Sequence, residues 1–175
     1  KIRRILDIGC SIGQCTVALK ERFPESEVWG IDVGAPMVRY AHKRAVDLGR
    51  EVHFAQRLAE DTKFPDEHFD VVNSFILFHE VTLEAQADIL REVHRILRPG
   101  GTFNIFDFPY NMRDKFPPFF RYFIEVDSRD NCEPYSVDFT MCDFEKNLQE
   151  AGFKTWAGED RIMIVKTVYA EKVSA

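Results

Sequence analysis

Short apolar segments alternate with amphipathic segments along most of this chain, and this alternation constrains the fold more than any other feature of the sequence. The apolar segments are rich in β-branched residues, as buried strands are, whereas the others repeat apolar residues every three or four positions, as helices do. Strict alternation predicts an α/β protein with a mostly parallel sheet and helices on both faces. The predicted strands are 2–8, 28–33, 52–55, 69–78, 102–108, 153–156 and 162–170, and the first three predicted helices are 12–23, 36–48 and 83–97.

The last part of the chain follows the same pattern with one difference. Thr140 and Asp143 have the spacing of a capping box, which predicts a fourth helix running to Ala151. The two strands after it are joined by only a short link. Because parallel strands need a longer crossover, one of the two, the last, is expected to be antiparallel.

The segment 109–137 interrupts the alternation, because it is far longer than an ordinary connection between a strand and a helix. It predicts a lid or substrate-binding insertion within a single domain 1–175; a local structural elaboration and a dimer contact, hence a homodimer, are the alternatives. Its aromatic side chains are suited to a pocket for an apolar or aromatic molecule. They would equally serve as the core of the lid, or pack against a preceding segment. These residues are Phe108, Tyr110, Phe116, Phe119, Phe120, Tyr122 and Phe123.

Charge and hydropathy exclude several classes of partner. The chain has 175 residues and a net charge of −6, and its 23 Lys and Arg residues form no block. A nucleic-acid backbone would be repelled on average, so no nucleic-acid partner is expected. No apolar run approaches the roughly 20 residues that span a bilayer, so no membrane span is expected.

The cysteines and the start of the chain indicate a cytoplasmic protein. The four cysteines show neither CxxC spacing nor a paired histidine motif, so free thiols in a reducing cytoplasm are expected and a metal site is not. No signal-peptide pattern opens the chain. A predicted strand begins within two residues of Lys1, so we expect that an N-terminal segment is missing.

The candidate ligand site follows the first two predicted strands. After the first comes the loop Asp7–Gly13, whose glycines allow a sharp turn and a close approach of a ligand to the backbone. The loop lacks the GxGxxG spacing of dinucleotide-binding proteins. Asp32 ends the second strand, where a carboxylate is suited to accept both hydroxyls of a ribose. The alternatives are a tight turn for the loop and a solvated turn aspartate for Asp32.

Six motifs in order resemble the class I S-adenosylmethionine-dependent methyltransferases along nearly the whole chain. The resemblance implies a Rossmann-like, mostly parallel seven-stranded sheet whose last strand is antiparallel, with the insertion after the fifth strand. S-adenosylmethionine would be the cofactor. The motifs are Ile5-Leu6-Asp7-Ile8-Gly9-Cys10, Gly30-Ile31-Asp32 with Met37, Ala59-Glu60-Asp61, Phe69-Asp70-Val71-Val72-Asn73-Ser74, Arg91-Glu92 through Leu97-Arg98-Pro99-Gly100-Gly101, and the helix Phe144–Ala151 followed by Gly152-Phe153.

The resemblance also implies a role for each site residue. The loop would surround the methionine part of the cofactor, Asp32 would hold the ribose, and Asn73 would offer its carbonyl to the ammonium group. Val33 or Met37 would pack on the adenine, and residues 58–60 would contact its edge through the backbone. Ser11 replaces a glycine of the family, which is tolerable with a negative φ, and Leu58 replaces an acid. The implied cofactor-binding residues are Asp7, Gly9, Cys10, Ser11, Gly13, Asp32, Val33, Met37, Leu58, Ala59, Glu60 and Asn73.

Two further residues are candidates for contact with the methyl acceptor. His79 follows the fourth strand and titrates near neutrality, so it is suited to take a proton from a hydroxyl; a hydrogen-bonded histidine at a helix entry is the alternative. Asp107 ends the fifth predicted strand and is the second candidate; an ordinary turn or cap residue is the alternative. The sequence thus predicts methyl transfer to a small apolar or aromatic molecule by direct displacement. A non-catalytic cofactor-binding module is the alternative, and the loop spacing counts against a nicotinamide-dependent oxidoreductase.

Overall fold

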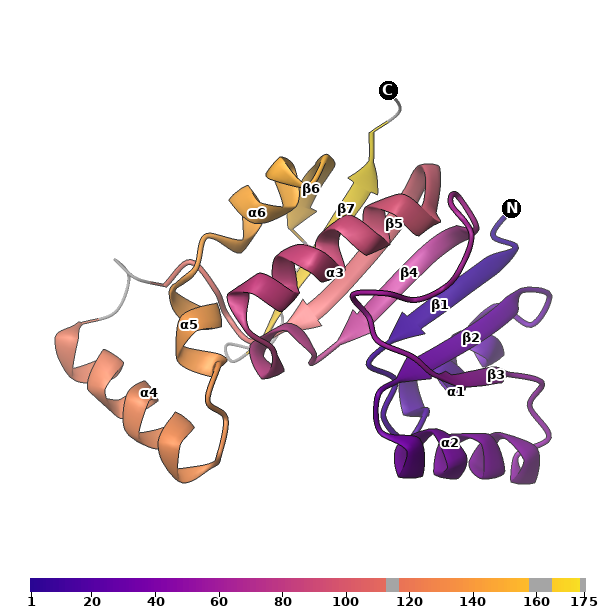
Figure 1. The fold of residues 1–175 in the computed structure, drawn as a ribbon, viewed down its shortest axis with the longest axis horizontal. Helices are drawn as coiled ribbons and strands as arrows, with labels where there is room; N and C mark the ends of the chain where they lie inside the picture. Colours follow the sequence, from indigo (N-terminus) through magenta and orange to yellow (C-terminus); the bar gives the residue numbers. More distant parts are fainter. Residues whose placement is uncertain (113–116, 158–164, 174–175) are drawn as a thin grey trace.

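A computed structural model describes residues 1–112, 117–157 and 165–173. It contains a seven-stranded sheet with helices on both faces (Figure 1), in the strand order β3-β2-β1-β4-β5-β7-β6. This confirms the predicted fold class. The strands are β1 (Arg4–Ile8), β2 (Glu27–Asp32), β3 (His53–Gln56), β4 (Phe69–Phe75), β5 (Leu97–Asp107), β6 (Phe153–Ala157) and β7 (Lys166–Lys172). The helices are α1 (Gln14–Arg22), α2 (Ala35–Asp47), the 3₁₀ turn η1 (Phe78–Glu80), α3 (Leu83–Ile96), α4 (Pro118–Asp130), α5 (Ser136–Met141) and α6 (Phe144–Glu150).

The strand directions place the carboxyl ends of β1 to β5 along one edge of the sheet. These five strands pair in parallel, and β7 lies antiparallel between β5 and β6. The antiparallel last strand is therefore confirmed. Asp7 of β1 is directly opposite Asn73 of β4 in this register. The order of strands reverses between β1 and β4, which is where open parallel sheets bind ligands.

Each face of the sheet has its own hydrophobic core, because alternate residues of a strand point to opposite faces. Ile5 of β1 packs with α1 and α2, whereas the next residue, Leu6, packs with α3 and α6. Burial of a side chain of this size contributes about 1.5–3 kcal/mol. The second core is the larger, and it extends to Phe139 of α5. The sheet is therefore held firmly from both sides at the edge where the candidate ligand site lies.

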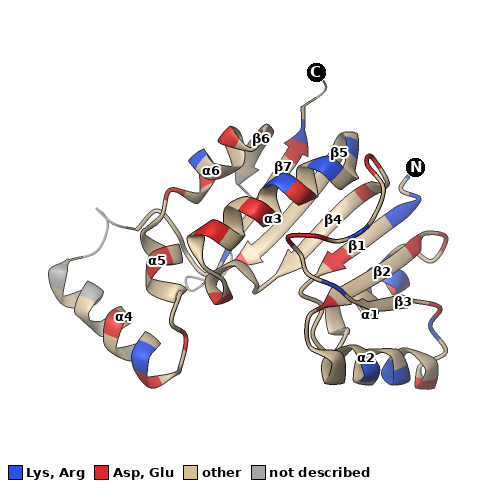
Figure 2. Cartoon of the chain, in the orientation of Figure 1, with Lys and Arg blue, Asp and Glu red and all other residues tan. Residues whose placement is uncertain are grey.

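Charged residues cover the outer faces of the helices. Figure 2 shows acidic and basic residues interspersed along α2, α3 and α6. Pairs one helical turn apart, such as Lys43 with Asp47 and Lys146 with Glu150, are exposed. Such pairs contribute about 0.3–0.5 kcal/mol each. Among the described residues, no helix has the length and apolar character needed to cross a membrane.

Several predicted boundaries differ from the structure; the fourth strand, for example, ends at Phe75 rather than at 78, where η1 begins. The fifth strand begins at Leu97 rather than 102, because Leu97 already pairs with Phe69 across an irregularity in the ladder. The Thr140–Asp143 capping box is wrong: Thr140 lies inside α5, and Asp143 itself caps α6 by accepting the backbone N–H of Lys146. The predicted last strand begins at 166, and residues 162–164 lie outside the described part.

The sequence pattern did not predict two helices: α4, which lies within the insertion, and α5, which begins at its end and extends beyond it. α5 contacts η1 and α4 contacts α5, so that α4 lies farthest from the sheet (Figure 1). Tyr110 is buried against Phe139, whereas Phe119 and Tyr122 of α4 are exposed. The insertion thus divides into a part that belongs to the core and a helix that projects outward. Three of its predicted pocket residues lie outside the described side chains: Phe116, Phe120 and Phe123.

Candidate active site

A cavity of about 420 Å³ lies at the carboxyl edge of the sheet, between β1 and β4. The glycine loop forms one wall and the residues that follow β4 form the other. It is lined by Asp7, Gly9, Cys10, Ser11, Ile12, Gln14, Cys15, Phe75 and Ile76. Five residues implied to bind the cofactor therefore lie around this space: Asp7, Gly9, Cys10 and Ser11 line it, and Gly13 closes the loop. Phe75, Ile76 and the cysteine of α1 were not predicted.

Asp7 is buried at the bottom of this cavity with two side-chain donors. The Thr16 hydroxyl donates to one carboxyl oxygen at 2.6 Å, and the Asn73 amide donates to the other at 2.8 Å. Burial raises the pKa of Asp7 to about 6, although these two hydrogen bonds act in the opposite direction. Among the described residues, the carbonyl oxygen of Asn73 has no donor. Asp7 and Asn73 thus present acceptors to a cationic group.

The glycine loop needs its glycines for both conformation and space. Gly9 and Gly13 have φ values of 65° and 72°, in the left-handed region. A β-carbon on Gly9 would lie 2.9 Å from the Leu77 side chain, and one on Gly13 would lie 2.8 Å from Phe54. The loop is therefore closely packed, and its free space faces the cavity.

Ser11 contradicts the expected negative φ, because its φ is 46°. The physical reason is the hydrogen bond from its backbone N–H to Asp32 Oδ2 at 2.8 Å, which turns the loop toward the end of β2. The backbone N–H of Gly34 donates to the other oxygen of Asp32, also at 2.8 Å. Asp32 is thus fixed by two backbone donors, and the remaining lone pairs of its carboxylate stay available to a ligand.

A second cavity, of about 210 Å³, lies beyond Asp32 and is lined by Val33, Gln56, Arg57 and Leu58. Val33 and Leu58 are 58% and 52% exposed, so both offer apolar surface to a ligand. Ala59 is buried below this surface and Glu60 is partly exposed. Gln56 and Arg57 are additions to the predicted set.

Two predicted cofactor residues, Met37 and Cys10, differ in their position relative to these cavities. Met37 packs on Gly34 at the start of α2 and lines neither cavity. Cys10 lines the larger cavity but is buried, and its backbone N–H donates to Ile31. Burial raises the pKa of its thiol, so it stays neutral near pH 7. Cys10 therefore contributes to packing and loop geometry, and its contact with the cofactor stays a prediction.

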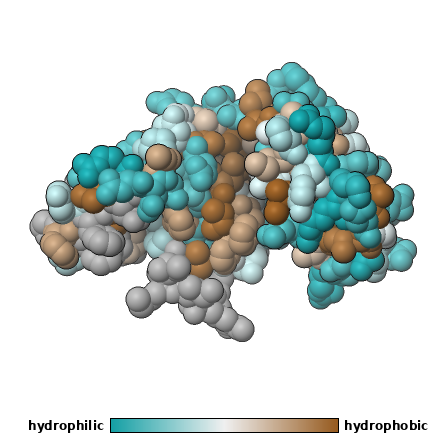
Figure 3. Space-filling view, turned by 90° about the horizontal axis from the view of Figure 1, so that it is seen from below, coloured by the Kyte–Doolittle hydropathy of each residue, from teal (hydrophilic) through white to brown (hydrophobic). Residues whose placement is uncertain are grey.

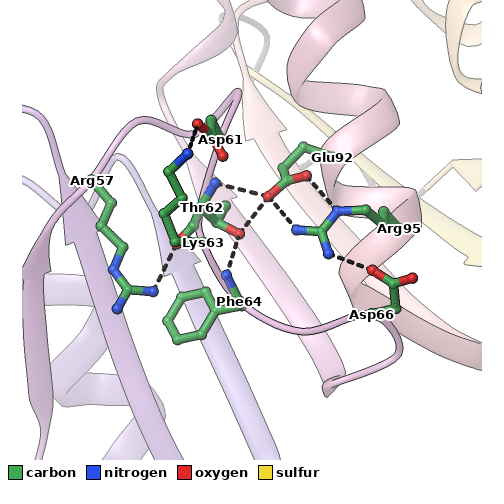
Figure 4. A network of polar contacts seen from close by, with 8 residues as sticks. All are labelled: Arg57, Asp61, Thr62, Lys63, Phe64, Asp66, Glu92 and Arg95. Carbon is green, nitrogen blue, oxygen red and sulfur yellow. Dashed lines mark hydrogen bonds and ion pairs between the residues drawn. The ribbon is translucent and has the colours of Figure 1, made fainter.

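A polar network holds the segment that carries Leu58 and Glu60 against α3 (Figure 4). Glu92 of α3 accepts the Thr62 hydroxyl at 2.6 Å and the Thr62 backbone N–H at 2.8 Å. Arg95 donates to both oxygens of Glu92 at 2.7 and 2.8 Å. Burial alone would raise the pKa of Glu92, but the bonds from Arg95 and Thr62 keep it below its ordinary value. The segment is thus fixed by a charged group.

His79 and Asp107, the two predicted acceptor residues, lie in contact. Nδ1 of His79 is 2.6 Å from Asp107 Oδ1, and both residues are only 1% exposed. Asp107 also accepts the backbone N–H groups of Leu77, Phe78 and Phe108 at 2.8–3.0 Å. Burial lowers the pKa of His79, but the bond and charge of Asp107 outweigh it and raise the pKa above its ordinary value. The ring orientation is therefore fixed by Asp107.

Apolar side chains gather in the hollow at this edge of the molecule (Figure 3). Phe75 at the end of β4 is 50% exposed and stacks in parallel on Phe106, with ring centroids 4.9 Å apart. Phe108 covers His79, with ring centroids 4.3 Å apart. An aromatic surface therefore lies between the larger cavity and the His79–Asp107 pair.

Comparison with known proteins agrees with this arrangement. A family model described as a methyltransferase domain matches residues 5–101, more than half of the chain. The demethylmenaquinone methyltransferase of Thermus thermophilus is 37% identical over 107 residues, which are 61% of this chain and 48% of that protein. The ubiquinone/menaquinone biosynthesis C-methyltransferase UbiE of Azotobacter vinelandii is 35% identical over 108 residues, or 60% of this chain and 42% of that protein. The chain thus spans about half the length of these curated relatives.

Solved structures share the fold over nearly the whole chain. The PH0226 protein of Pyrococcus horikoshii has a TM-score of 0.75 at 20% identity, covering 98% of this chain and 84% of its own. A SAM-dependent methyltransferase of Aquifex aeolicus has a TM-score of 0.74 at 24% identity, covering 98% and 82%. At these identities the likeness concerns the fold alone. The family match, together with the glycine loop and the acid at the end of β2, shows that the chain belongs to the methyltransferase-domain family.

Proposed function

We propose that this chain is an S-adenosylmethionine-dependent methyltransferase domain that acts on a small apolar or aromatic molecule. The observation that carries the proposal is the 420 Å³ cavity, because it brings the glycine loop, Asp7 and the exposed ring of Phe75 to one space. Surfaces that suit the cationic, polar and apolar parts of a ligand thus lie next to one another in this cavity. The family match and the named activities of the relatives support the same function.

The donors and acceptors at this edge fit the proposed cofactor. The Asn73 carbonyl and the Asp7 carboxylate would accept its ammonium group, and Asp32 would accept the ribose hydroxyls. Val33 and Leu58 would pack on the adenine, since both expose apolar surface in the second cavity. When bound, S-adenosylmethionine supplies a methyl group on a positively charged sulfur, which needs no further activation.

The role proposed for the protein in the reaction is to align the acceptor with the methyl group. Methyl transfer forms a bond from the acceptor to the methyl carbon while the methyl–sulfur bond breaks, with its electron pair remaining on sulfur. Alignment of this kind contributes several kcal/mol to the lowering of the barrier. Phe75 and Phe106 present a flat aromatic surface beside the cavity. Because the matched relatives are named for quinone biosynthesis, we propose an aromatic or quinone-like ring as the acceptor.

His79 is proposed to contact the acceptor from the other side of this aromatic surface, with Asp107 behind it. Asp107 accepts the Nδ1 proton, which leaves the Nε2 lone pair of a neutral His79 available to a hydroxyl of the acceptor. In this role Asp107 is a positioning residue and His79 is the group that touches the acceptor. We also propose that the protein is cytoplasmic, which cell fractionation tests, and that it forms a homodimer, which analytical sedimentation tests.

Cofactor binding is tested by isothermal titration of the protein with S-adenosylmethionine and with S-adenosylhomocysteine. We expect one ligand per chain, and for Asp32→Ala an affinity at least about tenfold weaker, since a hydrogen bond to a charged group contributes about 1.5–3 kcal/mol. Asp88→Ala is the matched control and should bind as the parent does, because Asp88 is a partly exposed aspartate on α3 that lines neither cavity. Equal affinity in Asp32→Ala and Asp88→Ala would remove the ribose assignment, and no binding by any form would contradict the proposed function.

A further inference from the structure

Three potential metal ligands converge where the insertion meets the end of β4. They are His79 and Glu80 in η1 and Glu133 in the connection between α4 and α5, and one ligand atom from each lies within 4.8 Å of the others. His79 is buried, Glu133 is half-buried and Glu80 is exposed. The sequence pattern gave no sign of this group, because Glu133 lies more than fifty residues from the other two.

The histidine already has the orientation that metal-binding histidines have. Asp107 is 2.6 Å from Nδ1, and three backbone N–H groups hold the Asp107 carboxylate in place. This contact assigns the proton of a neutral ring to Nδ1 and leaves the lone pair of Nε2 on the side of Glu80 and Glu133. A carboxylate behind the ring is the usual second partner of a histidine that binds a metal through its other nitrogen.

The charges of the group are not balanced by the surrounding protein. Among the described residues, no lysine or arginine pairs with the side chain of Glu80 or Glu133, and the partner of Glu80 is His79 itself. When His79 is neutral, three acceptors face one another; the carboxylates around it raise the pKa of His79 above its ordinary value despite its burial, so a proton on Nε2 competes for the same place. A cation in their midst would remove the repulsion between the two carboxylates.

The spacing fits a small divalent ion. Nε2 of His79 and Oε1 of Glu80 are 3.4 Å apart, which is the separation of two ligands that each lie about 2.1 Å from one ion at a tetrahedral angle. To complete the set, rotation of the half-buried Glu133 side chain has to bring its oxygen from within 4.8 Å of the other two ligand atoms to a separation like that of His79 and Glu80. One nitrogen and two carboxylate oxygens suit Zn²⁺ and its neighbours rather than Ca²⁺.

We propose that His79, Glu80 and Glu133 bind a divalent transition-metal ion, with Zn²⁺ as the reference case. Three protein ligands leave one coordination position open, as in zinc sites that bind a further oxygen ligand. The ion would connect the insertion to η1, the turn that follows β4, because Glu133 belongs to the former and His79 to the latter. It would also occupy the Nε2 lone pair, so the metal-bound protein would not use His79 as a proton acceptor. The proposal does not rest on methyltransferase activity.

The test is metal binding by the full chain after treatment with a chelator. We expect one Zn²⁺ per chain by isothermal titration, a rise in the melting temperature with added Zn²⁺, and visible absorption on addition of Co²⁺. Glu80→Gln and Glu133→Gln should each weaken Zn²⁺ binding by at least about tenfold, since the loss of even an outer partner costs about 10–100-fold. Glu84→Gln is the matched control, because Glu84 is an exposed acid at the start of α3, outside the group.

The two glutamate variants carry the test, because a change of the buried His79 risks misfolding. Zn²⁺ affinity that is the same in Glu133→Gln as in Glu84→Gln would overturn the site. So would the absence of stoichiometric binding by the parent protein, in which case an imidazolium ion at His79 balances the two carboxylates instead. Neither result depends on cofactor binding, so failure here leaves the proposed function to be judged by its own titration.

Discussion

Two aspartates at the same edge of the sheet, Asp7 and Asp107, are equally buried but held in different ways. Both are 1% exposed, and each ends or nearly ends a strand. Asp7 accepts two hydrogen bonds from neutral side chains, those of Thr16 and Asn73. Asp107 accepts three from the backbone and contacts the ring of His79. Burial is thus compensated incompletely at Asp7 and by a full set of partners at Asp107.

The different hydrogen-bond partners of Asp7 and Asp107 indicate different roles for the two carboxyl groups. A carboxyl whose pKa is raised to about 6 gains when a cation arrives, because the cation supplies the stabilisation that the folded protein lacks. A carboxylate held by backbone N–H groups determines the conformation of the chain around it. We therefore infer that Asp7 serves a ligand and that Asp107 serves the fold and, through it, the orientation of His79.

The largest expected effect is that of Asp107→Asn on stability. The amide keeps the shape of the side chain but turns an NH₂ group toward backbone donors and removes the charge next to His79. We expect the free energy of unfolding to fall by about 3 kcal/mol, as when one partner of a buried pair is removed. Urea denaturation measures this, with Asp7→Asn as the comparison. A loss as large in Asp7→Asn as in Asp107→Asn would contradict the distinction between the two aspartates.

The second expected effect is that of Asp7→Asn on cofactor affinity. The amide retains a carbonyl acceptor but lacks the charge proposed to face the ammonium group. We expect S-adenosylmethionine to bind about tenfold more weakly at pH 7.5, in line with the strength of a charge-assisted hydrogen bond. Asp88→Ala serves again as the control. An unchanged affinity would show that Asp7 contributes to the loop alone.

The pH dependence of ligand affinity and of stability in the parent protein tests the proposed role of Asp7 further. Below about pH 6 the Asp7 carboxyl is protonated, so affinity for the cationic ligand should fall as the pH drops through this value, and Asp7→Asn should show no such step. For the unfolding of the ligand-free protein the sign is opposite. Folded Asp7 keeps its proton up to about pH 6, whereas the unfolded chain releases it near 3.8, so raising the pH between these values destabilises the protein. Titration calorimetry and thermal melts from pH 4.5 to 7.5 distinguish the two slopes.

The smallest expected effect concerns Ser11, which lies between Asp7 and Asp32. Its φ of 46° is unfavourable for a residue with a β-carbon, so Ser11→Gly relieves strain while adding disorder to the unfolded chain. The net gain in the free energy of unfolding should be at most about 1 kcal/mol. Ser11→Ala keeps the β-carbon and should give none. A gain from alanine as large as that from glycine would exclude backbone strain as the cause.

The sequence predicted those site residues that lie in short segments directly after a strand. The glycine loop and Asp32 each follow a strand directly, so the order of the elements places them at the carboxyl edge without knowledge of any side-chain contact. The fold was predictable for the same reason, since strands and helices alternate with clear periods. The φ of Ser11 was not, because it depends on a hydrogen bond to Asp32, more than twenty residues away.

The rest of the site depends on contacts between distant residues. His79 and Asp107 were each candidates, but their contact follows from the pairing of β4 with β5 and from the turn at η1. α4 was missed although its apolar residues follow a helical spacing, and α5, with six residues, is too short to show a period. Glu133 lies near His79 and Glu80 only because α5, which follows it in the chain, packs on η1. Positions like these are determined by tertiary packing, on which local sequence patterns carry no information.

The antiparallel course of β7 has a practical consequence for experiments on this protein. Because β7 begins opposite Asp107 and runs back across the sheet, it ends at the edge from which β1 starts. The start of β1 and the end of β7 therefore both lie on the side away from the cavities (Figure 1). A fluorescent reporter or a surface-attachment tag joined on this side would leave the ligand entrance unobstructed, which makes immobilised binding assays feasible.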